Sequence, residues 1–310
     1  MIEPTLNYVT CPGPAVRRAG DPERSDHRMA YWEWNATGNP THPHVIVCVH
    51  GLTRQGRDFD VLARALAPHA RVICPDVAGR GRSEWLADPL HYAVPQYALD
   101  MLVLLQQLHA QSPIQTLDWI GTSMGGLIGM ALAGQPQLPL PVAIRRLVLN
   151  DVGPTLEWAA LQRIGSYVGQ PVRFASVEQA AAALRIISAG FGPHTDAEWL
   201  ALTAPMLTPL PDGGLGLHYD PAIGVALRAM TREEADQGQA IMWQLYDQIT
   251  ARTLLLRGEL SDLLTADTAQ AMQGRGPRAQ CVTLANVGHA PTLVAADQVA
   301  VVRDFVLAQE

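Results

Sequence analysis

The sequence contains no long hydrophobic run. No apolar stretch in its 310 residues approaches the roughly 20 residues that a membrane-spanning helix needs. The N-terminus has no basic region followed by an apolar stretch, which is the pattern of a secretory signal. We therefore expect a cytoplasmic protein without a membrane partner.

Cysteine is scarce, with four residues at Cys11, Cys48, Cys74 and Cys281. Their spacing matches neither a zinc-binding pattern nor a redox motif. Three of them fall within expected strands, where cysteine behaves as a small buried hydrophobic residue. No histidines and carboxylates lie at the close sequence spacing of a metal site. The sequence therefore predicts neither a metal site nor a cofactor.

Charge is also sparse, since charged residues make up 16% of the chain and the net charge is −7. An acidic surface disfavours nucleic acid and anionic membranes, so we expect neither of them as a partner. Residues 79–83, Gly-Arg-Gly-Arg-Ser, lack the lysine and the glycine spacing of a phosphate-binding P-loop. We interpret them as a turn.

A serine between two glycines is the most informative feature that is present. Residues 117–120 are an apolar strand, Ser123 follows between Gly121 and Gly125, and a helix-forming segment comes next. Glycines remove the side chains that would collide at a sharp strand-to-helix turn. Free N–H groups at the start of the helix suit an oxyanion beside the serine. Ser123 is therefore the predicted nucleophile.

A serine nucleophile needs a base and an acid that orients the base. His289 lies in a glycine-containing loop after a short strand and is the predicted base. We prefer Asp262, which follows the apolar strand at 252–257, as the acid. Asp151, at the end of the strand at 146–150, is the alternative acid. Glu259 is expected to cap its turn or to pair with an arginine.

Further motifs give the chain a resemblance to the α/β-hydrolases of the capped esterase and lactonase type. His50-Gly51 after the strand at 45–49 resembles the family's oxyanion loop, and residues 76–83 resemble its aspartate-glycine-glycine-serine turn. The order serine, acid, histidine also matches. The resemblance implies an oxyanion hole formed by the N–H groups of Leu52 and Met124. Thr122 departs from the histidine, asparagine or glutamine that relatives often carry before the serine.

Strands alternate with helices on both sides of a central segment that shows no convincing strands. This alternation predicts an α/β fold, with a mainly parallel central sheet covered by helices on both faces. Residues 1–151 and 251–310 would form the core, with an edge strand at 28–34, and residues 152–250 a helical cap (lid). Helices are expected near 156–167, 177–187, 196–202 and 231–248. The apolar candidates for the substrate pocket in this segment are Trp158, Tyr167, Met206, Met242 and Trp243.

The predicted function is hydrolysis of an apolar ester or lactone, such as an aliphatic oligoester, through an acyl-enzyme. The fold also includes carbon–carbon bond hydrolases and cofactor-free oxygenases or peroxidases. A ligand-binding receptor with a vestigial triad is a further alternative. The oxygenase hypothesis would gain support if Asp151 rather than Asp262 were the orienting acid. His194 and His218, in the cap, are further candidates for reaching the pocket, whereas His50 is expected to support the oxyanion loop.

Overall fold

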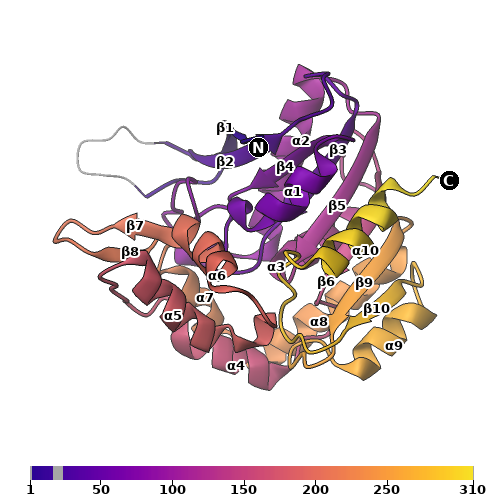
Figure 1. Ribbon diagram of the computed structural model, residues 1–310. Helices are drawn as coiled ribbons and strands as arrows, with labels where there is room; N and C mark the ends of the chain where they lie inside the picture. Colours follow the sequence, from indigo (N-terminus) through magenta and orange to yellow (C-terminus); the bar gives the residue numbers. More distant parts are fainter. Residues whose placement is uncertain (1, 17–23, 310) are drawn as a thin grey trace.

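The computed structural model describes residues 2–16 and 24–309. Eight strands form one sheet in the order β1-β2-β4-β3-β5-β6-β9-β10 (Figure 1). The pairs β1/β2 and β2/β4 are antiparallel, and all other neighbours are parallel. The strands are β1 (Thr5–Pro12), β2 (Asp26–Trp34), β3 (His44–Val49), β4 (Arg71–Pro75), β5 (Thr116–Thr122), β6 (Ile144–Asn150), β9 (Arg252–Gly258) and β10 (Gln280–Leu284).

Ten α-helices occur among the described residues. They are α1 (Asp60–Leu66), α2 (Val94–Gln111), α3 (Met124–Ala133), α4 (Trp158–Tyr167), α5 (Val177–Ile187), α6 (Asp196–Thr203), α7 (Ile223–Ala229), α8 (Arg232–Gln248), α9 (Ala266–Gly274) and α10 (Ala296–Leu307). Short 3-10 helices cover Gly56–Phe59, Pro89–His91, Ala189–Phe191 and Ala204–Met206. None of the helices in residues 2–16 and 24–309 has the length and hydropathy to cross a membrane.

The helices cover both faces of the sheet, as the alternating pattern predicts. Buried residues of α1 and α10 pack on one face, and those of α2, α3, α8 and α9 pack on the other. The central strands are almost wholly buried, and all five residues of β4 are buried. Continuous apolar sequences such as Val-Ile-Val-Cys-Val at 45–49 fit this environment, because helices cover both faces.

The predicted edge strand is wrong in its position. β2 is the second strand, because β1 pairs with it along its outer side. β1 buries only Val9 and Cys11 and exposes most of its other residues, including Leu6 and Tyr8. A strand with so weak a burial pattern gives little hydrophobic signal in the sequence.

The segment 152–250 contains the expected helices and two elements that the sequence analysis missed. α5 has the predicted bounds, and α6 and α8 each begin with a capping box formed by Thr195 with Glu198 and by Thr231 with Glu234. The missed elements are α7 and a hairpin of β7 (Leu207–Pro209) and β8 (Leu215–Leu217). Helices α4 to α7 and the hairpin lie to one side of the sheet (Figure 1), whereas α8 packs against α3.

Candidate active site

Ser123 occupies the turn between β5 and α3 in a left-handed backbone conformation, with φ 51° and ψ −114°. A Cβ atom on Gly121 would collide with the backbone of Gly125, and one on Gly125 would collide with the carbonyl of Val49. The two glycines therefore allow α3 to approach β5 and β3 closely enough to hold the serine in this conformation.

Ser123, His289 and Asp151 form one continuous chain of hydrogen bonds. His289 Nε2 lies 2.9 Å from Ser123 Oγ, and His289 Nδ1 lies 2.7 Å from Asp151 Oδ2. A carboxylate at Nδ1 favours the tautomer in which Nδ1 carries the proton, so Nε2 can accept the serine proton. The arrangement is that of a nucleophile, a base and an orienting acid.

The structure places the alternative acid, Asp151, beside His289. Asp151 is fully buried at the end of β6, which lies between β5 and β9. Its carboxylate also accepts hydrogen bonds from the N–H of Gly258, at 2.8 Å, and from the hydroxyl of Ser261, at 2.7 Å. The β9 loop thus supplies support for the acid rather than the acid itself.

The preference for Asp262 as the group beside His289 is wrong in this geometry. The Asp262 side chain is 53% exposed and pairs with Arg163 on α4, at 2.5 Å. The residue before it, Ser261, is the one that points to the buried carboxylate. Glu259 accepts a hydrogen bond from the N–H of Asn286, at 3.0 Å, so it bonds to the loop after β10 rather than within its own turn.

The loop after β3, which was expected to form part of the oxyanion hole, is held by the buried imidazole of His50. Its Nδ1 donates to the carbonyl of Gly51, at 2.7 Å, and its Nε2 accepts from the N–H of Val77, at 3.0 Å. Burial lowers the pKa of His50 to about 3, so the ring stays neutral and keeps both bonds. The carbonyl of Gly51 belongs to the same peptide unit as the N–H of Leu52. His50 therefore fixes the direction of that N–H group.

Arg80 is a second support of this loop, and the sequence analysis did not identify it. Its guanidinium is fully buried and donates from Nε to the carbonyl of Leu52, at 2.9 Å. Its Nη2 lies 3.6 Å from the sulfur of Met124. One side chain therefore contacts both residues that were expected to form the oxyanion hole. We call Ser123, His289, Asp151, His50 and Arg80 the carboxyl-edge cluster.

Thr122, the unusual residue before the nucleophile, is held by Asn150. The amide of Asn150 donates to the hydroxyl of Thr122, at 2.9 Å, and to the carbonyl of Pro291, at 2.8 Å. It thereby links the ends of β5 and β6 to the loop that carries His289. The hydrogen bond from Asn150 therefore holds Thr122 in a position that is compatible with the placement of Ser123 and His289.

A cavity of about 250 Å³ opens at Ser123 and His289. Its lining includes the oxyanion loop, residues of α4 to α6 and the hairpin, and the polar residues Arg54, Asp58 and Arg163. Arg54 is engaged by Asp58 and by the carbonyl of Leu202. We call the side that α4 to α6 and their loops contribute the outer wall, represented by Arg163, Tyr167, Ile187, Phe191, Leu202 and Met206.

Two of the five pocket candidates line this cavity, namely Tyr167 and Met206. Trp158 lines a separate surface hollow. Met242 and Trp243, on α8, pack against the hydrophobic core instead. The prediction failed for these two because α8 belongs to the layer of helices on the sheet, where large apolar residues fill the core.

His194 and His218 are absent from the lining of this cavity. His194 Nε2 lies 2.7 Å from the hydroxyl of Thr292, which does line it. His218 Nδ1 accepts a hydrogen bond from the N–H of Gly81, at 2.7 Å. Both histidines therefore join the segment 152–250 to loops of the sheet edge.

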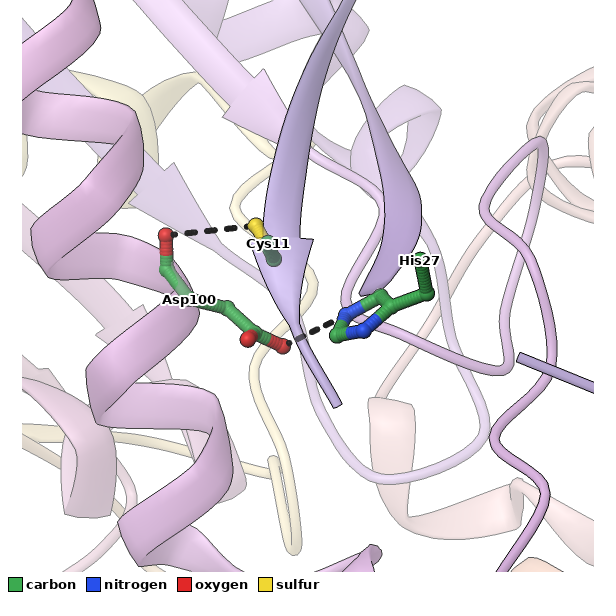
Figure 2. A group of neighbouring side chains, drawn as sticks. All are labelled: Cys11, His27 and Asp100. Atoms are coloured by element: carbon green, nitrogen blue, oxygen red, sulfur yellow. Dashed lines mark hydrogen bonds and ion pairs between the residues drawn. The ribbon is translucent and has the colours of Figure 1, made fainter. Parts of the chain in front are cut away.

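A second polar cluster lies far from the nucleophile along the chain, at the β1–β2 hairpin. Figure 2 shows His27 pointing to the Asp100 carboxylate and Cys11 facing the Asp100 backbone. These three buried residues are close enough to hold a metal ion. However, His27 Nδ1 is already 2.9 Å from the carbonyl of Gly13, and Gln96 donates to Asp100. Burial raises the pKa of the Cys11 thiol far above its usual range. The hydrogen bonds therefore account for these polar groups as a link between the hairpin and α2.

Comparisons with known proteins identify the family of this chain. The model of the alpha/beta hydrolase family matches residues 46–302. The chain is 48% identical over 305 residues to a protein of Cupriavidus necator named 3-hydroxybutyrate-oligomer hydrolase, covering 97% of each chain. It is 29% identical to a pimeloyl-[acyl-carrier protein] methyl ester esterase of Xanthomonas campestris, covering 84% of this chain and 93% of that one. The crystal structure of an alpha/beta hydrolase from Novosphingobium aromaticivorans has a TM-score of 0.79 and 35% identity, with 97% of each chain covered. The chain belongs to the α/β-hydrolase family.

Proposed function

We propose that this chain hydrolyses short oligoesters of hydroxy acids, with Ser123 as nucleophile, His289 as base and Asp151 as orienting acid. The observation that carries the proposal is the continuous hydrogen-bonded chain from Ser123 to Asp151. The chain is an ester-cleaving hydrolase, as its family and its named relatives indicate. The 48% identity to a 3-hydroxybutyrate-oligomer hydrolase supports the class of ester.

The reaction has two acyl-transfer steps. His289 Nε2 takes the hydroxyl proton as Ser123 Oγ attacks the ester carbonyl, and the resulting imidazolium donates that proton to the departing alcohol. A water molecule then attacks the acyl-enzyme, with His289 again as base. Asp151 holds the imidazole in the required tautomer and stabilises its positive charge.

The N–H groups of Leu52 and Met124 would stabilise the tetrahedral oxyanion. Both belong to residues that line or adjoin the cavity at Ser123, and Met124 is the first residue of α3. N–H groups at the start of a helix have no partner within the helix, so this one is available for an anion. The fixed peptide of Leu52 is ready for the same task because His50 orients it.

The segment around α4 to α7 acts as the cap in this proposal. It contributes the outer wall of the cavity, so it determines which acyl groups fit above Ser123. α8 is left out of the cap, because it packs on α3. The proposed cap therefore ends near residue 230 and is shorter than the segment 152–250 that the sequence predicts.

The charges of the outer wall fit an oligoester that ends in a free acid. Most wall residues are apolar, as the methyl and methylene groups of a hydroxyalkanoate require. Arg163, a cation of the wall, forms an ion pair with Asp262, and both side chains of this pair are exposed to solvent. A substrate carboxylate can therefore replace Asp262 at a small cost in free energy. An oligomer of 3-hydroxybutyrate carries one such carboxylate at its end.

The test is hydrolysis of the linear dimer, trimer and tetramer of 3-hydroxybutyrate by the wild-type chain. Ser123→Ala, with its fold checked by circular dichroism, is the control. Multiple turnovers by the wild type and none by folded Ser123→Ala would support the proposal. Activity on simple aryl esters without activity on any oligomer would contradict the substrate class, and equal inactivity of both proteins on all esters would contradict ester hydrolysis.

Asp151 beside His289 also favours one alternative, a cofactor-free oxygenase. That function is expected with an acid at the end of β6, the position that Asp151 occupies. Such an enzyme would consume oxygen with its organic substrate. An oxygen electrode distinguishes the two functions, because ester hydrolysis requires no oxygen uptake.

A further inference from the structure

Arg80 combines complete burial with the absence of a carboxylate partner. Its side chain donates to three oxygens: the carbonyls of Leu52 and Ala78, at 2.9 and 2.7 Å, and the hydroxyl of Tyr97, at 2.9 Å. The guanidinium also lies over the rings of Tyr92 and Tyr97. In residues 2–16 and 24–309, no carboxylate is within ion-pair distance of it.

A buried cation without a counter-ion is costly, because burial removes its hydration and no anion replaces it. Neutral oxygens and aromatic faces recover only part of that loss. The carboxylate of Asp220 accepts a hydrogen bond from the hydroxyl of Tyr92, and the ring of Tyr92 contacts the guanidinium of Arg80. The positive charge at this place therefore requires an explanation beyond packing.

The location of Arg80 supplies that explanation. Two peptide units flank the α-carbon of Leu52. His50 and the N–H of Arg54 hold the carbonyl of the first, and Arg80 holds the carbonyl of the second. With both planes fixed, the N–H of Leu52 has one available direction. Arg80 also contacts the side chain of Met124, the second expected donor.

We propose that Arg80 is a positioning residue for the oxyanion hole: it holds the carbonyl of Leu52 and adds positive potential where the tetrahedral anion forms. The neutral ester carbonyl of the ground state gains little from this potential, whereas the oxyanion gains more. Arg80 therefore acts on kcat rather than on KM. This inference rests on the proposed function, because it assumes the oxyanion of an acyl transfer at Ser123.

The test compares Arg80→Gln and Arg80→Lys with the wild type on a neutral p-nitrophenyl ester. We expect Arg80→Gln to lower kcat about 100-fold, with KM within about threefold, as for the loss of an oxyanion donor. Lysine keeps the charge but cannot form all the bonds of the guanidinium, so Arg80→Lys should recover about tenfold of that loss. Tyr97→Phe keeps the ring and removes one bond of Arg80, and should lower kcat a few-fold.

Arg146→Gln is the matched control, since Arg146 is another fully buried arginine, bonded to the carbonyls of Val306 and Ala308. Its loss should lower the melting temperature but leave kcat within about threefold. A purely structural role of Arg80 would give the same result at position 80. Unchanged kcat in folded Arg80→Gln, or in Tyr97→Phe and Arg80→Lys if the glutamine variant does not fold, would overturn the proposal.

An alkylboronic acid provides a readout that requires no turnover. It binds to the serine as a tetrahedral anion, so its Kd should rise in parallel with the loss of kcat in the Arg80 variants. An unchanged Kd beside a reduced kcat would contradict the role at the oxyanion. Wild-type protein that binds the boronic acid but hydrolyses no ester would contradict the proposed function and leave the Kd comparison as the test of Arg80.

Discussion

The carboxyl-edge cluster and the outer wall face the same cavity but are built differently. In the cluster, Asp151, His50 and Arg80 are buried, and each makes several hydrogen bonds to loops of different strands. In the outer wall, Ile187 is 57% exposed and Arg163 forms an ion pair with a solvent-exposed aspartate. Groups that share many buried partners move together, whereas groups with few partners can be rearranged at a small cost in free energy. The cluster is thus suited to fixed chemistry and the wall to the choice of substrate.

The largest effect should follow from the removal of the nucleophile at the centre of the cluster. Ser123→Ala deletes the oxygen that attacks in the proposed reaction, and the remaining rate enhancement then comes from the oxyanion hole and substrate binding. We expect kcat on a p-nitrophenyl ester to fall about 10⁴-fold or more. Residual activity near the wild-type level in a folded variant would contradict the assignment of the chemistry to the carboxyl-edge cluster.

The two candidate acids differ in their surroundings: Asp151 belongs to the cluster, whereas Asp262 pairs with Arg163 of the outer wall. Asp151→Asn should lower kcat about 10³- to 10⁴-fold, because the amide cannot hold the required imidazole tautomer. Asp262→Asn removes an exposed ion pair and should change kcat less than about threefold. Steady-state kinetics of both variants on one ester measures the contrast. Equal losses would mean that Asp262 contributes to the chemistry.

These two acids also show what the sequence could and could not predict. Ser123 and His289 stand out because each needs a local glycine pattern, which the chain displays within a few residues. The acid needs only a strand end, and Asp151 and Asp262 both follow strands. Ser261 decides between them through a contact with Asp151 across 110 residues. The local sequence around either acid does not indicate such a contact.

The fold could likewise be predicted only where the local sequence pattern is strong. Central strands and the helices at 177–187 and 196–202 have strong apolar patterns or caps, and they were found. β1 and the β7–β8 hairpin are short or largely exposed, so their hydrophobic signal is weak. Met242 and Trp243 were assigned to the pocket because helical periodicity identifies an apolar face but does not reveal which layer covers it.

A smaller effect should come from the cation of the outer wall. Arg163→Gln should raise KM about tenfold for the free-acid dimer of 3-hydroxybutyrate, because a charge-assisted bond to the carboxylate is lost. The methyl ester of the same dimer should show little change. The matched control is Arg173→Gln, since Arg173 also forms an exposed pair, with Asp212, but is absent from the cavity lining. Equal changes for acid and methyl ester would contradict carboxylate binding by Arg163.

The smallest effect concerns His218. It joins the segment 152–250 to Gly81, the residue after Arg80, by a hydrogen bond. Burial lowers the pKa of His218 to about 4 from its ordinary value near 6.5. Between these values the unfolded chain binds a proton that the folded chain excludes, so stability falls as the pH falls from about 6.5 to 4. His218→Asn keeps an acceptor for Gly81 and does not titrate.

We therefore expect His218→Asn to lose about 1 to 2 kcal/mol less unfolding free energy than the wild type between pH 7 and pH 4.5. Urea denaturation of both proteins at the two pH values gives this difference. The contributions of His50 and Asp76, whose pKa values are shifted by burial in opposite directions, are present in both proteins and cancel. A larger acid loss in the variant would show that His218 is charged in the folded protein.

The most direct test of the proposed chemistry is the rate at which a fluorophosphonate modifies the protein. Ser123 Oγ attacks phosphorus, fluoride leaves, and the serine proton passes to His289, so the rate reports the chain of hydrogen bonds without a choice of substrate. We predict one adduct on Ser123 by mass spectrometry, none in Ser123→Ala, a rate lowered about 10³-fold in Asp151→Asn and a rate within about threefold of wild type in Asp262→Asn. Modification of Asp151→Asn at the wild-type rate, or a large loss in Asp262→Asn alone, would contradict the assignment of the triad.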